Sequence, residues 1–400
     1  MSDADEHAQF ERVDWAEIDR SKQLLTAERA SLLVGLVLLF GLFLYDYYVA
    51  HVYLVGTWMV EWVDWVILLG VVLLVAYGAV PAIKSRDSVG RIIRRAASRR
   101  LTAAAGLFLL LFVLAGAIGP AVFPNPGLRF EHGFHPPLGF ESTVVPVECL
   151  GELSGEAFEE TCAGTAEYPL GTNERGHPMT FLLAAGARVA LYVVVFTTAF
   201  VVPLAVAVGV IAGLRGGLVD DLLMSYVDIQ LSIPAIVVYF IGYSYYNTSL
   251  LLLLVAFGLF SWGGIARLVR SEVLQRREDG YVLVARSLGG SWSYIARRHI
   301  LPNSTNTVLP AVFQLLALLV LVEAGIAFLG FHDIELYSWG STISESVNAD
   351  VPPQILSRAP YPAYQIWWVS TLPALALTGV IVSFKLVGDG LRDAVDPRRD

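Results

Sequence analysis

The chain has 400 residues, of which 56% are hydrophobic and only 16% are charged, and its mean hydropathy is +0.61. Soluble domains have about 45–50% apolar and about 25% charged residues, so the excess apolar surface indicates a membrane protein. The net charge is −9 and no basic stripe is present, which argues against a nucleic acid as a partner. Residues 1–30 are polar, so the first apolar segment is expected to be a retained anchor and not a cleaved signal.

Eight apolar segments are each close to the roughly 20 residues that a membrane-spanning helix needs. They are 31–50, 62–81, 101–123, 189–213, 229–246, 248–266, 308–330 and 366–384. We therefore expect an all-α integral membrane protein with about eight transmembrane helices. Pro124–Gly127, after the third segment, is expected to form turns.

Loop charges predict the orientation, because short cytoplasmic loops are enriched in Lys and Arg. Loop 84–100 has seven basic residues and one acid, and loop 271–303 has five arginines and three acids. Loop 124–178 has nine glutamates and only two arginines, which places it outside. Both termini are then expected in the cytoplasm of a multi-pass protein of the cell membrane.

Four parts follow along the chain. They are a cytoplasmic tail (1–30), a two-helix hairpin (31–83), a basic cytoplasmic linker (84–100) and a six-helix body (101–400). The hairpin is mainly apolar, so it is expected to fold independently and to lie peripheral to any solute pathway.

Motifs for several enzyme classes are absent from the sequence. None of the three lysines follows a glycine, so the chain has no phosphate-binding P-loop and is not expected to hydrolyse ATP. An intramembrane enzyme would need paired acids or a histidine cluster, and no pair is evident among the ionisable residues in or beside the helices. These are Asp46, Asp64, Asp228 and Glu323. No metal site is expected.

Segment 281–303 of the predicted cytoplasmic loop has the composition of two short helices. Ala285, Leu288 and Gly289 share one helical face, where small residues would let a partner protein approach closely. Gly289 is expected to end the first helix, and Ser291 to cap the second. The alternative is an amphipathic linker that lies on the membrane surface.

The same segment resembles the cytoplasmic loop of ABC importer permeases, which carries Glu-Ala-Ala, then a glycine, then Ile-x-Leu-Pro. Gly289 and Leu301-Pro302 stand at the required spacing, whereas the triplet reads Leu283-Val284-Ala285 and His299 replaces the isoleucine. The missing glutamate leaves open how the loop pairs with an ATPase. Pro302 is expected to break the second helix before the next span.

The resemblance extends over about residues 101–400. Segments 169–176, 186–190, 222–234, 323–330, 338–340, 367–368 and 388–397 match in order. Together they resemble the second, C-type permease subunit of dipeptide/oligopeptide ABC transporters, a family that also serves nickel or other solutes. The hairpin 31–83 has no counterpart in that six-helix pattern.

This resemblance implies a non-catalytic subunit that pairs with a second permease subunit, two ATPase subunits and an external solute-binding protein. It implies that ATP is used by the partner ATPases and that this chain binds no cofactor. The coupling residues that it implies are Val284, Ala285, Arg286, Leu288, Gly289, Leu301 and Pro302. The alternative is a secondary transporter, which would show inverted repeats that we do not find.

Other residues leave two interpretations open. Glu323 is a candidate pathway residue because ionisable groups inside membranes are usually functional, or it bonds a neighbouring backbone near the outer helix end. His132 and His135 could bind a metal, but a solvated loop is expected. Several aromatic side chains are expected to form an interfacial belt: Trp62, Trp65, Tyr243, Tyr245, Tyr246, Trp367 and Trp368.

The chain's two cysteines, Cys149 and Cys162, lie in the loop assigned to the external side. Disulfides persist in oxidising environments, so we predict that the two are bonded to each other. The alternative is a pair of free, buried thiols.

Overall fold

A computed structural model describes residues 26–50, 54, 59–156, 160–246, 249–331, 336–347 and 363–395. The chain divides into two compact units. The smaller unit contains the described residues up to Val60 together with Val72–Ser85. The larger unit contains Glu61–Val71 and the described residues from Arg86 onward.

The smaller unit is helical. Its elements are α2 (Ala27–Tyr45), a π-helical turn (Asp46–Ala50), the last part of α3 (Trp62–Leu74), a second π-helical turn (Val75–Ala79) and α4 (Val80–Lys84). The Thr26 hydroxyl accepts a hydrogen bond from the Arg29 N–H and caps α2. Lys84 pairs with Glu28 at 2.6 Å. No residue of α2 is buried within the chain, so its apolar side chains are available to lipid.

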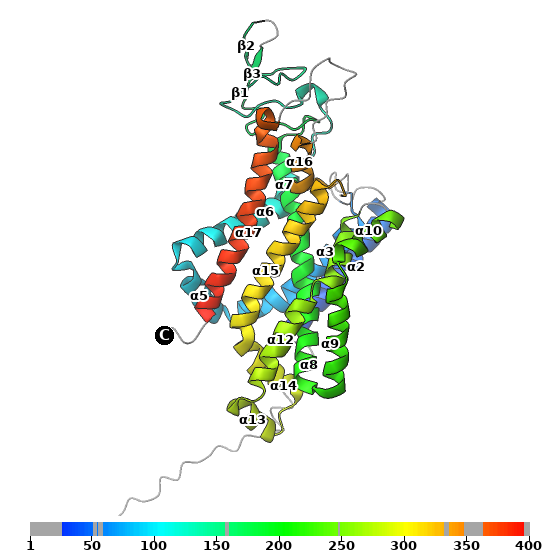
Figure 1. Cartoon of the computed structure of the whole chain (residues 1–400), viewed down its shortest axis with the longest axis vertical. Coiled ribbons are helices and arrows are strands. Elements are labelled where there is room, and N and C mark those ends of the chain that lie inside the picture. The colour runs from blue at the N-terminus through cyan, green and yellow to red at the C-terminus, as the bar shows by residue number, and fades with distance from the viewer. Residues whose placement is uncertain are drawn as a thin grey trace, which may run out of the picture. The chain divides into compact units, whose positions relative to one another are not determined.

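The larger unit contains the remaining helices (Figure 1). They are α5 (Arg86–Ala97), α6 (Arg100–Val122), α7 (Met179–Phe196), α8 (Val202–Arg215), α9 (Gly217–Ser232), α10 (Ala235–Tyr246), α11 (Leu250–Phe260), α12 (Gly263–Arg276), α13 (Gly280–Ser287), α14 (Trp292–Ile295), α15 (Leu301–Phe328), α16 (Trp339–Val347) and α17 (Trp367–Val395). Helices α15 and α6 pack against α17, α7 packs against α6, and α12 packs against α8.

The described helices contain seven that are long and apolar enough to cross a membrane, or eight if the bent pair α9–α10 is one span. This confirms the predicted number. The fifth predicted span, 229–246, is in fact split, because α9 and α10 meet at an angle of 69°. Pro234 favours an extended conformation in the preceding residue, and Ile233 has φ −96° and ψ 118°.

Pro302 does not break a helix, contrary to the expectation. One continuous helical segment runs from Trp292 to Phe328. A π-helical turn, Ala296–Ile300, precedes the proline, and the Leu301 N–H bonds to the Ala296 carbonyl. Pro302 lies in the first turn of α15, where its missing N–H is tolerated.

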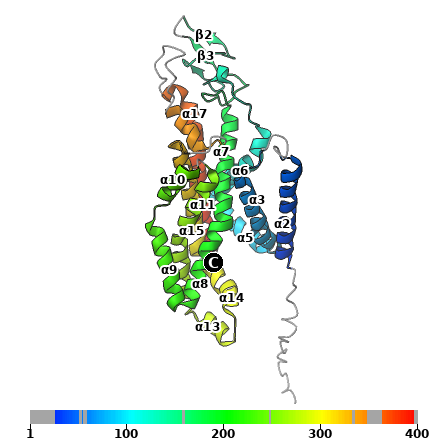
Figure 2. The same ribbon diagram turned by 90° about the vertical axis from the view of Figure 1, so that its right-hand side faces the viewer.

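A small antiparallel sheet was not expected in the loop 124–178. It consists of β1 (Glu141–Ser142), β2 (Leu153–Ser154) and β3 (Thr161–Ala163), in the order β1-β3-β2. Pro124–Gly127 forms neither helix nor strand. Within the larger unit the strands lie at one end, and α13 and α14 lie at the other (Figures 1 and 2).

The first part of α3 contributes to the core of the larger unit. Val63 is 2% exposed and Ile67 is 5% exposed, and both belong to the apolar cluster that contains Val189 and Val193 of α7. The unit boundaries therefore differ from the predicted boundary at 84–100, because Glu61–Val71 groups with the body.

Candidate functional site

Helix α13 ends where the sequence predicts. Gly289 has φ +83°, a left-handed conformation that favours glycine. The Gly290 N–H bonds to the Ala285 carbonyl at 3.0 Å, which satisfies one of the last carbonyls of the helix. The Ser291 hydroxyl accepts from the Tyr294 N–H at 3.3 Å and caps the next helix. Glycine and serine thus set the ends of the two helices.

The exposed side of α13 carries apolar residues. Leu288 is 83% exposed, Val284 is 59% exposed and Leu283 is 48% exposed. Ala285, by contrast, is half-buried and packs against the apolar core of the larger unit. The exposed side of α13 therefore presents Leu283, Val284 and Leu288 beside Gly289, whereas Ala285 points inward. Exposed apolar patches of this kind mark protein interaction sites.

Helix α13 is attached to the long helices by buried side chains. Val282, Ile295 and Ile300 are each 2% exposed or less and belong to the main apolar cluster. The Arg286 guanidinium lies 4.9 Å from the Trp292 ring centroid, which joins α13 to α14 by a cation–π contact. These contacts join α13 to α14, which continues into α15 within the helical segment 292–328.

Glu323 lies in the C-terminal half of α15 and is 5% exposed. We call the end of the larger unit that carries the strands the outer end, after the orientation expected from the loop charges. It lines a small cavity together with Val189, Tyr239, Ser249 and Ser338, among others. Ser338, from the segment before α16, also lines this cavity and interacts with the Glu323 carboxyl. The cavity brings together residues from α7, α10, α11 and α15.

A buried ion pair joins α3 to α7. The Arg188 Nη2 atom lies 3.0 Å from the Asp64 Oδ1 atom, and the Asp64 side chain is 5% exposed. Tyr192 donates to the same carboxylate oxygen and accepts from Arg188 Nε at 2.8 Å. The other Asp64 oxygen accepts from the Glu61 N–H at 2.9 Å. Asp64 is recognisable in the sequence as an ionisable residue beside a span, but its partner is not, since Arg188 lies 124 residues away.

The segment 169–176 organises the outer end of the larger unit. The Thr172 hydroxyl donates to the His132 carbonyl at 2.7 Å and accepts from the His135 N–H at 2.8 Å. The Asn173 amide donates to Glu345 of α16 at 2.7 Å. Trp368, expected in an interfacial belt, is instead 1% exposed and donates to the Thr172 carbonyl at 2.9 Å. The matched segments thus contact each other in space.

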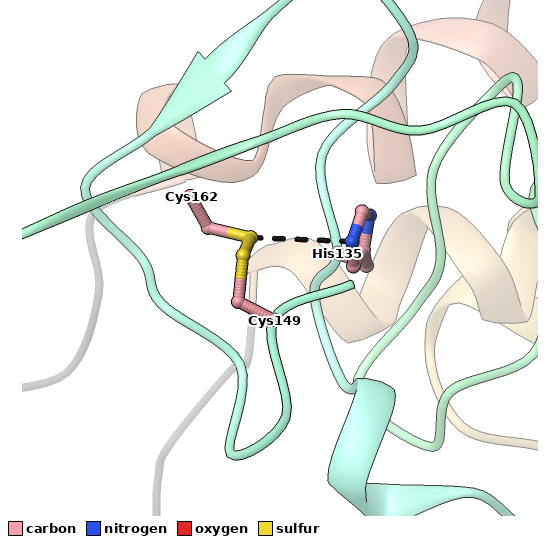
Figure 3. A group of neighbouring side chains, drawn as sticks. All are labelled: His135, Cys149 and Cys162. Carbon is pink, nitrogen blue, oxygen red and sulfur yellow. Dashed lines mark hydrogen bonds between the residues drawn. A yellow bond between two sulfur atoms is a disulfide. The ribbon is translucent and has the colours of Figure 1, made fainter. Parts of the chain in front are cut away.

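The two external histidines are buried, contrary to the expectation of a solvated loop. His132 is 8% exposed and its Nδ1 atom lies 2.8 Å from the Tyr168 hydroxyl. His135 is fully buried, and burial lowers its pKa. Its Nε2 atom lies 3.9 Å from the Cys162 sulfur (Figure 3).

Cys149 and Cys162 form a disulfide, with Cα atoms 6.0 Å apart. Both sulfurs lie near His135, but a disulfide offers no thiolate to a metal ion. Replacing both cysteines with serine is expected to lower the stability of the outer segment by about 3 kcal/mol, because the bond restricts the unfolded chain. Thermal unfolding of the double variant would measure this loss. Two reactive thiols in unreduced, denatured wild-type protein would contradict the bond.

His177 is expected to make the outer end less stable in acid. Burial lowers the pKa of its imidazole, as does Arg175, and neither ring nitrogen has a hydrogen-bond partner among the described residues. Protonation therefore favours the unfolded state, so stability is complete above the ordinary pKa of about 6.5 and falls below it. Glu345 opposes this trend, since burial raises its pKa.

We expect His177→Phe to lose less thermal stability than the wild type between about pH 7.5 and about pH 5. Phenylalanine suits the site, because the ring already contacts Tyr337 and Phe181 at centroid distances of 5.1 and 5.8 Å. Melting curves at both pH values provide the measurement. An identical loss in both proteins would show that His177 is not the responsible group.

The long apolar helices define the class of a multi-pass membrane protein. A family model described as "Binding-protein-dependent transport system inner membrane component" matches residues 205–400. The chain belongs to this family and, within it, to the dipeptide/oligopeptide ABC permeases.

Several relatives are similar over most of their length. The dipeptide transport system permease protein DppC of Bacillus subtilis is 27% identical over 298 residues, which cover 74% of this chain and 82% of the relative. The oligopeptide transport system permease protein OppC of Escherichia coli K12 is 31% identical over 230 residues, 57% of this chain and 72% of the relative. A solved MetNI methionine ABC transporter chain is 19% identical, with a TM-score of 0.41, and covers 55% of this chain and 98% of that chain.

Proposed function

We propose that this chain forms half of the translocation pathway of an ATP-driven, binding-protein-dependent importer, with di- or oligopeptides as the solute. The observation that carries the proposal is the exposed Leu283, Val284 and Leu288 surface of α13, in the loop that corresponds to the family's ATPase contact. The similarity to dipeptide and oligopeptide transport permeases favours peptides over other solutes.

The mechanism follows from how α13 is attached. Two ATPase subunits, on binding ATP, would draw this loop toward that of a second permease subunit. Buried Val282, Ile295 and Ile300 would transmit the displacement to the continuous segment 292–328, which carries Glu323 at its other end. Such coupling requires that ATP and solute each favour one of two global states. Glu323 is the residue that we place beside the pathway.

The partners proposed are one further permease subunit, two ATPase subunits and an external solute-binding protein that docks at the outer end. ATP is used by the ATPases, and this chain contributes neither a catalytic group nor a bound cofactor. Both termini and α13 lie in the cytoplasm in this proposal, which agrees with the arginine excess of 84–100 and 271–303.

Proteoliposomes that contain this chain and its partners test the proposal. Uptake of a labelled peptide is expected only with internal-facing ATPases, ATP and the binding protein together. Uptake driven by an ion gradient without ATPases would establish a secondary transporter instead. ATP-dependent uptake of nickel or another small solute, but not of peptides, would support the ATP-driven mechanism and contradict the assignment of peptides as the substrate.

A further inference from the structure

Helix α5 lies between two predicted membrane spans. The candidate span before it ends at Lys84, and the one after it begins at Arg100. Since both neighbours are long enough to cross the bilayer, the 12 residues of α5 stay at one membrane surface. A helix of this length extends about 18 Å at 1.5 Å per residue, so it occupies an area of several lipid headgroups.

One face of α5 is used for packing within the larger unit. Ala96 is 6% exposed, and Val89 and Ile92 are partly buried. These positions recur at helical spacing, so they form one stripe, and α5 packs against α17 and α6. Figure 1 shows α5 beside the end of α17 from which the C-terminus emerges, away from the strands.

The rest of the helix surface is basic. Arg86, Arg91, Arg94 and Arg95 are all exposed, and Arg91 also donates to Ser88 at 3.0 Å. Asp87 is the only acidic residue among residues 84–100. Positive charge is therefore concentrated on a surface that the fold keeps at the edge of the membrane.

An apolar side chain lies at the edge of the basic surface. Ile93 is 56% exposed, and it shares a helix face with Arg86, seven residues before it, next to the packed stripe. A basic surface that includes an exposed isoleucine matches the boundary between phosphate headgroups and acyl chains, where amphipathic helices lie. A surface that only faced water would gain nothing from exposing this side chain.

From this arrangement we propose that α5 is a binding surface for anionic lipid headgroups, which its arginines contact while Ile93 enters the acyl boundary. Juxtamembrane basic residues attract anionic lipids with about 1 kcal/mol each, a roughly fivefold effect on the lipid partition. Arginine is suited to this role because its planar guanidinium forms paired hydrogen bonds to phosphate. The bound lipid would fix the linker at the membrane surface.

The test uses the full chain in nanodiscs that contain phosphatidylglycerol and phosphatidylcholine, with labelled phosphatidylglycerol as the probe. With the wild type, the ratio of protein-bound phosphatidylglycerol to phosphatidylcholine is expected to exceed the ratio in the bulk lipid; we call this excess the enrichment. In the triple variant Arg86→Gln, Arg91→Gln, Arg94→Gln, the enrichment is expected to be at least about tenfold smaller. The matched control is Arg297→Gln, Arg298→Gln, Arg392→Gln, which removes the same charge from other exposed positions. The control is expected to keep most of the enrichment.

Salt provides a second measurement that does not depend on a variant folding. Wild-type enrichment is expected to fall as the screening length is reduced to about 3 Å by salt. Three results would each overturn the proposal. They are no enrichment in the wild type, an enrichment that salt does not alter, and an equal loss of enrichment in the α5 variant and the control.

Discussion

Replacement of Asp64 by alanine is expected to destabilise the larger unit by about 3 kcal/mol, because it removes the carboxylate that pairs with the partly buried Arg188. The Arg188 Nη2 atom lies 3.0 Å from Asp64 Oδ1, and Asp64 is only 4% exposed. Tyr192 would keep its hydrogen bond to Arg188 but cannot neutralise it. The thermal unfolding midpoint in detergent measures the loss.

A double variant separates the lost charge from lost packing. Asp64→Leu with Arg188→Leu replaces the pair by apolar residues, which is often nearly neutral for stability. We therefore expect the double variant to recover most of the stability that Asp64→Ala loses. The control is Asp228→Ala, which removes the exposed ion pair between Asp228 and Arg267. It is expected to change the thermal unfolding midpoint little, because exposed ion pairs contribute little to stability. A double variant as unstable as the single one would contradict the account.

The same pair changes the expectation for a truncated chain. From the sequence alone, the hairpin 31–83 is expected to be peripheral, so a chain starting near Arg94 is expected to insert in the same orientation and still support ATP-dependent uptake with its partners. That truncation removes Asp64, Val63 and Ile67, which lie in the core of the larger unit. We now expect the truncated chain to insert in the same orientation but to be unstable, with partial rescue by Arg188→Leu. A stable, transport-active truncated chain would contradict this.

A tryptophan at position 289 is expected to abolish ATPase association and transport while the chain still inserts. Apart from its two chain neighbours, no described residue has an atom within 4 Å of the position that a side chain at 289 would take, so the new side chain would project outward beside Leu288. It would then obstruct the surface that we assign to the ATPase. Co-purification and peptide uptake measure the effect.

The backbone of Gly289 requires a matched control, because φ is +83°. Any L-residue other than glycine is disfavoured there by about 1–2 kcal/mol, and Asn tolerates it better. Gly289→Ala therefore carries the strain without the bulk, and Gly289→Asn reduces the strain. Both are expected to retain substantial transport. If the Trp, Ala and Asn variants are all inactive, the loss of transport is due to backbone strain at position 289. Normal transport in Gly289→Trp would show that this surface does not dock an ATPase.

Local features were predictable from the sequence because they depend on neighbouring residues. Long apolar runs predicted the spans, and glycine and serine predicted the ends of α13 and α14. The bend between α9 and α10 was not predicted. A proline inside an apolar segment is nevertheless a usable signal for such a bend, because Pro234 restricts the backbone of Ile233. The role of Pro302 was predicted wrongly, because a proline in the first turn of a helix does not interrupt it.

Contacts between distant residues were not predictable. Asp64 and Arg188 are separated by 124 residues, and Asn173 and Glu345 by 172. Nothing in a single sequence shows that such residues meet. The burial of His132 and His135 follows from the packing of Tyr168 and Thr172 around them, which depends on the fold of the whole outer segment.

Cross-linking from position 288 tests most directly whether α13 contacts an ATPase. The chain's two cysteines are joined in a disulfide, so Leu288→Cys introduces the only free thiol. Val147→Cys, at a position that is 86% exposed on the outer segment, is the control. With the assembled importer and a short thiol cross-linker, Leu288→Cys is predicted to join this chain to an ATPase subunit, and Val147→Cys is not. Absence of that product from a transport-active complex, or its formation from Val147→Cys instead, would contradict the account.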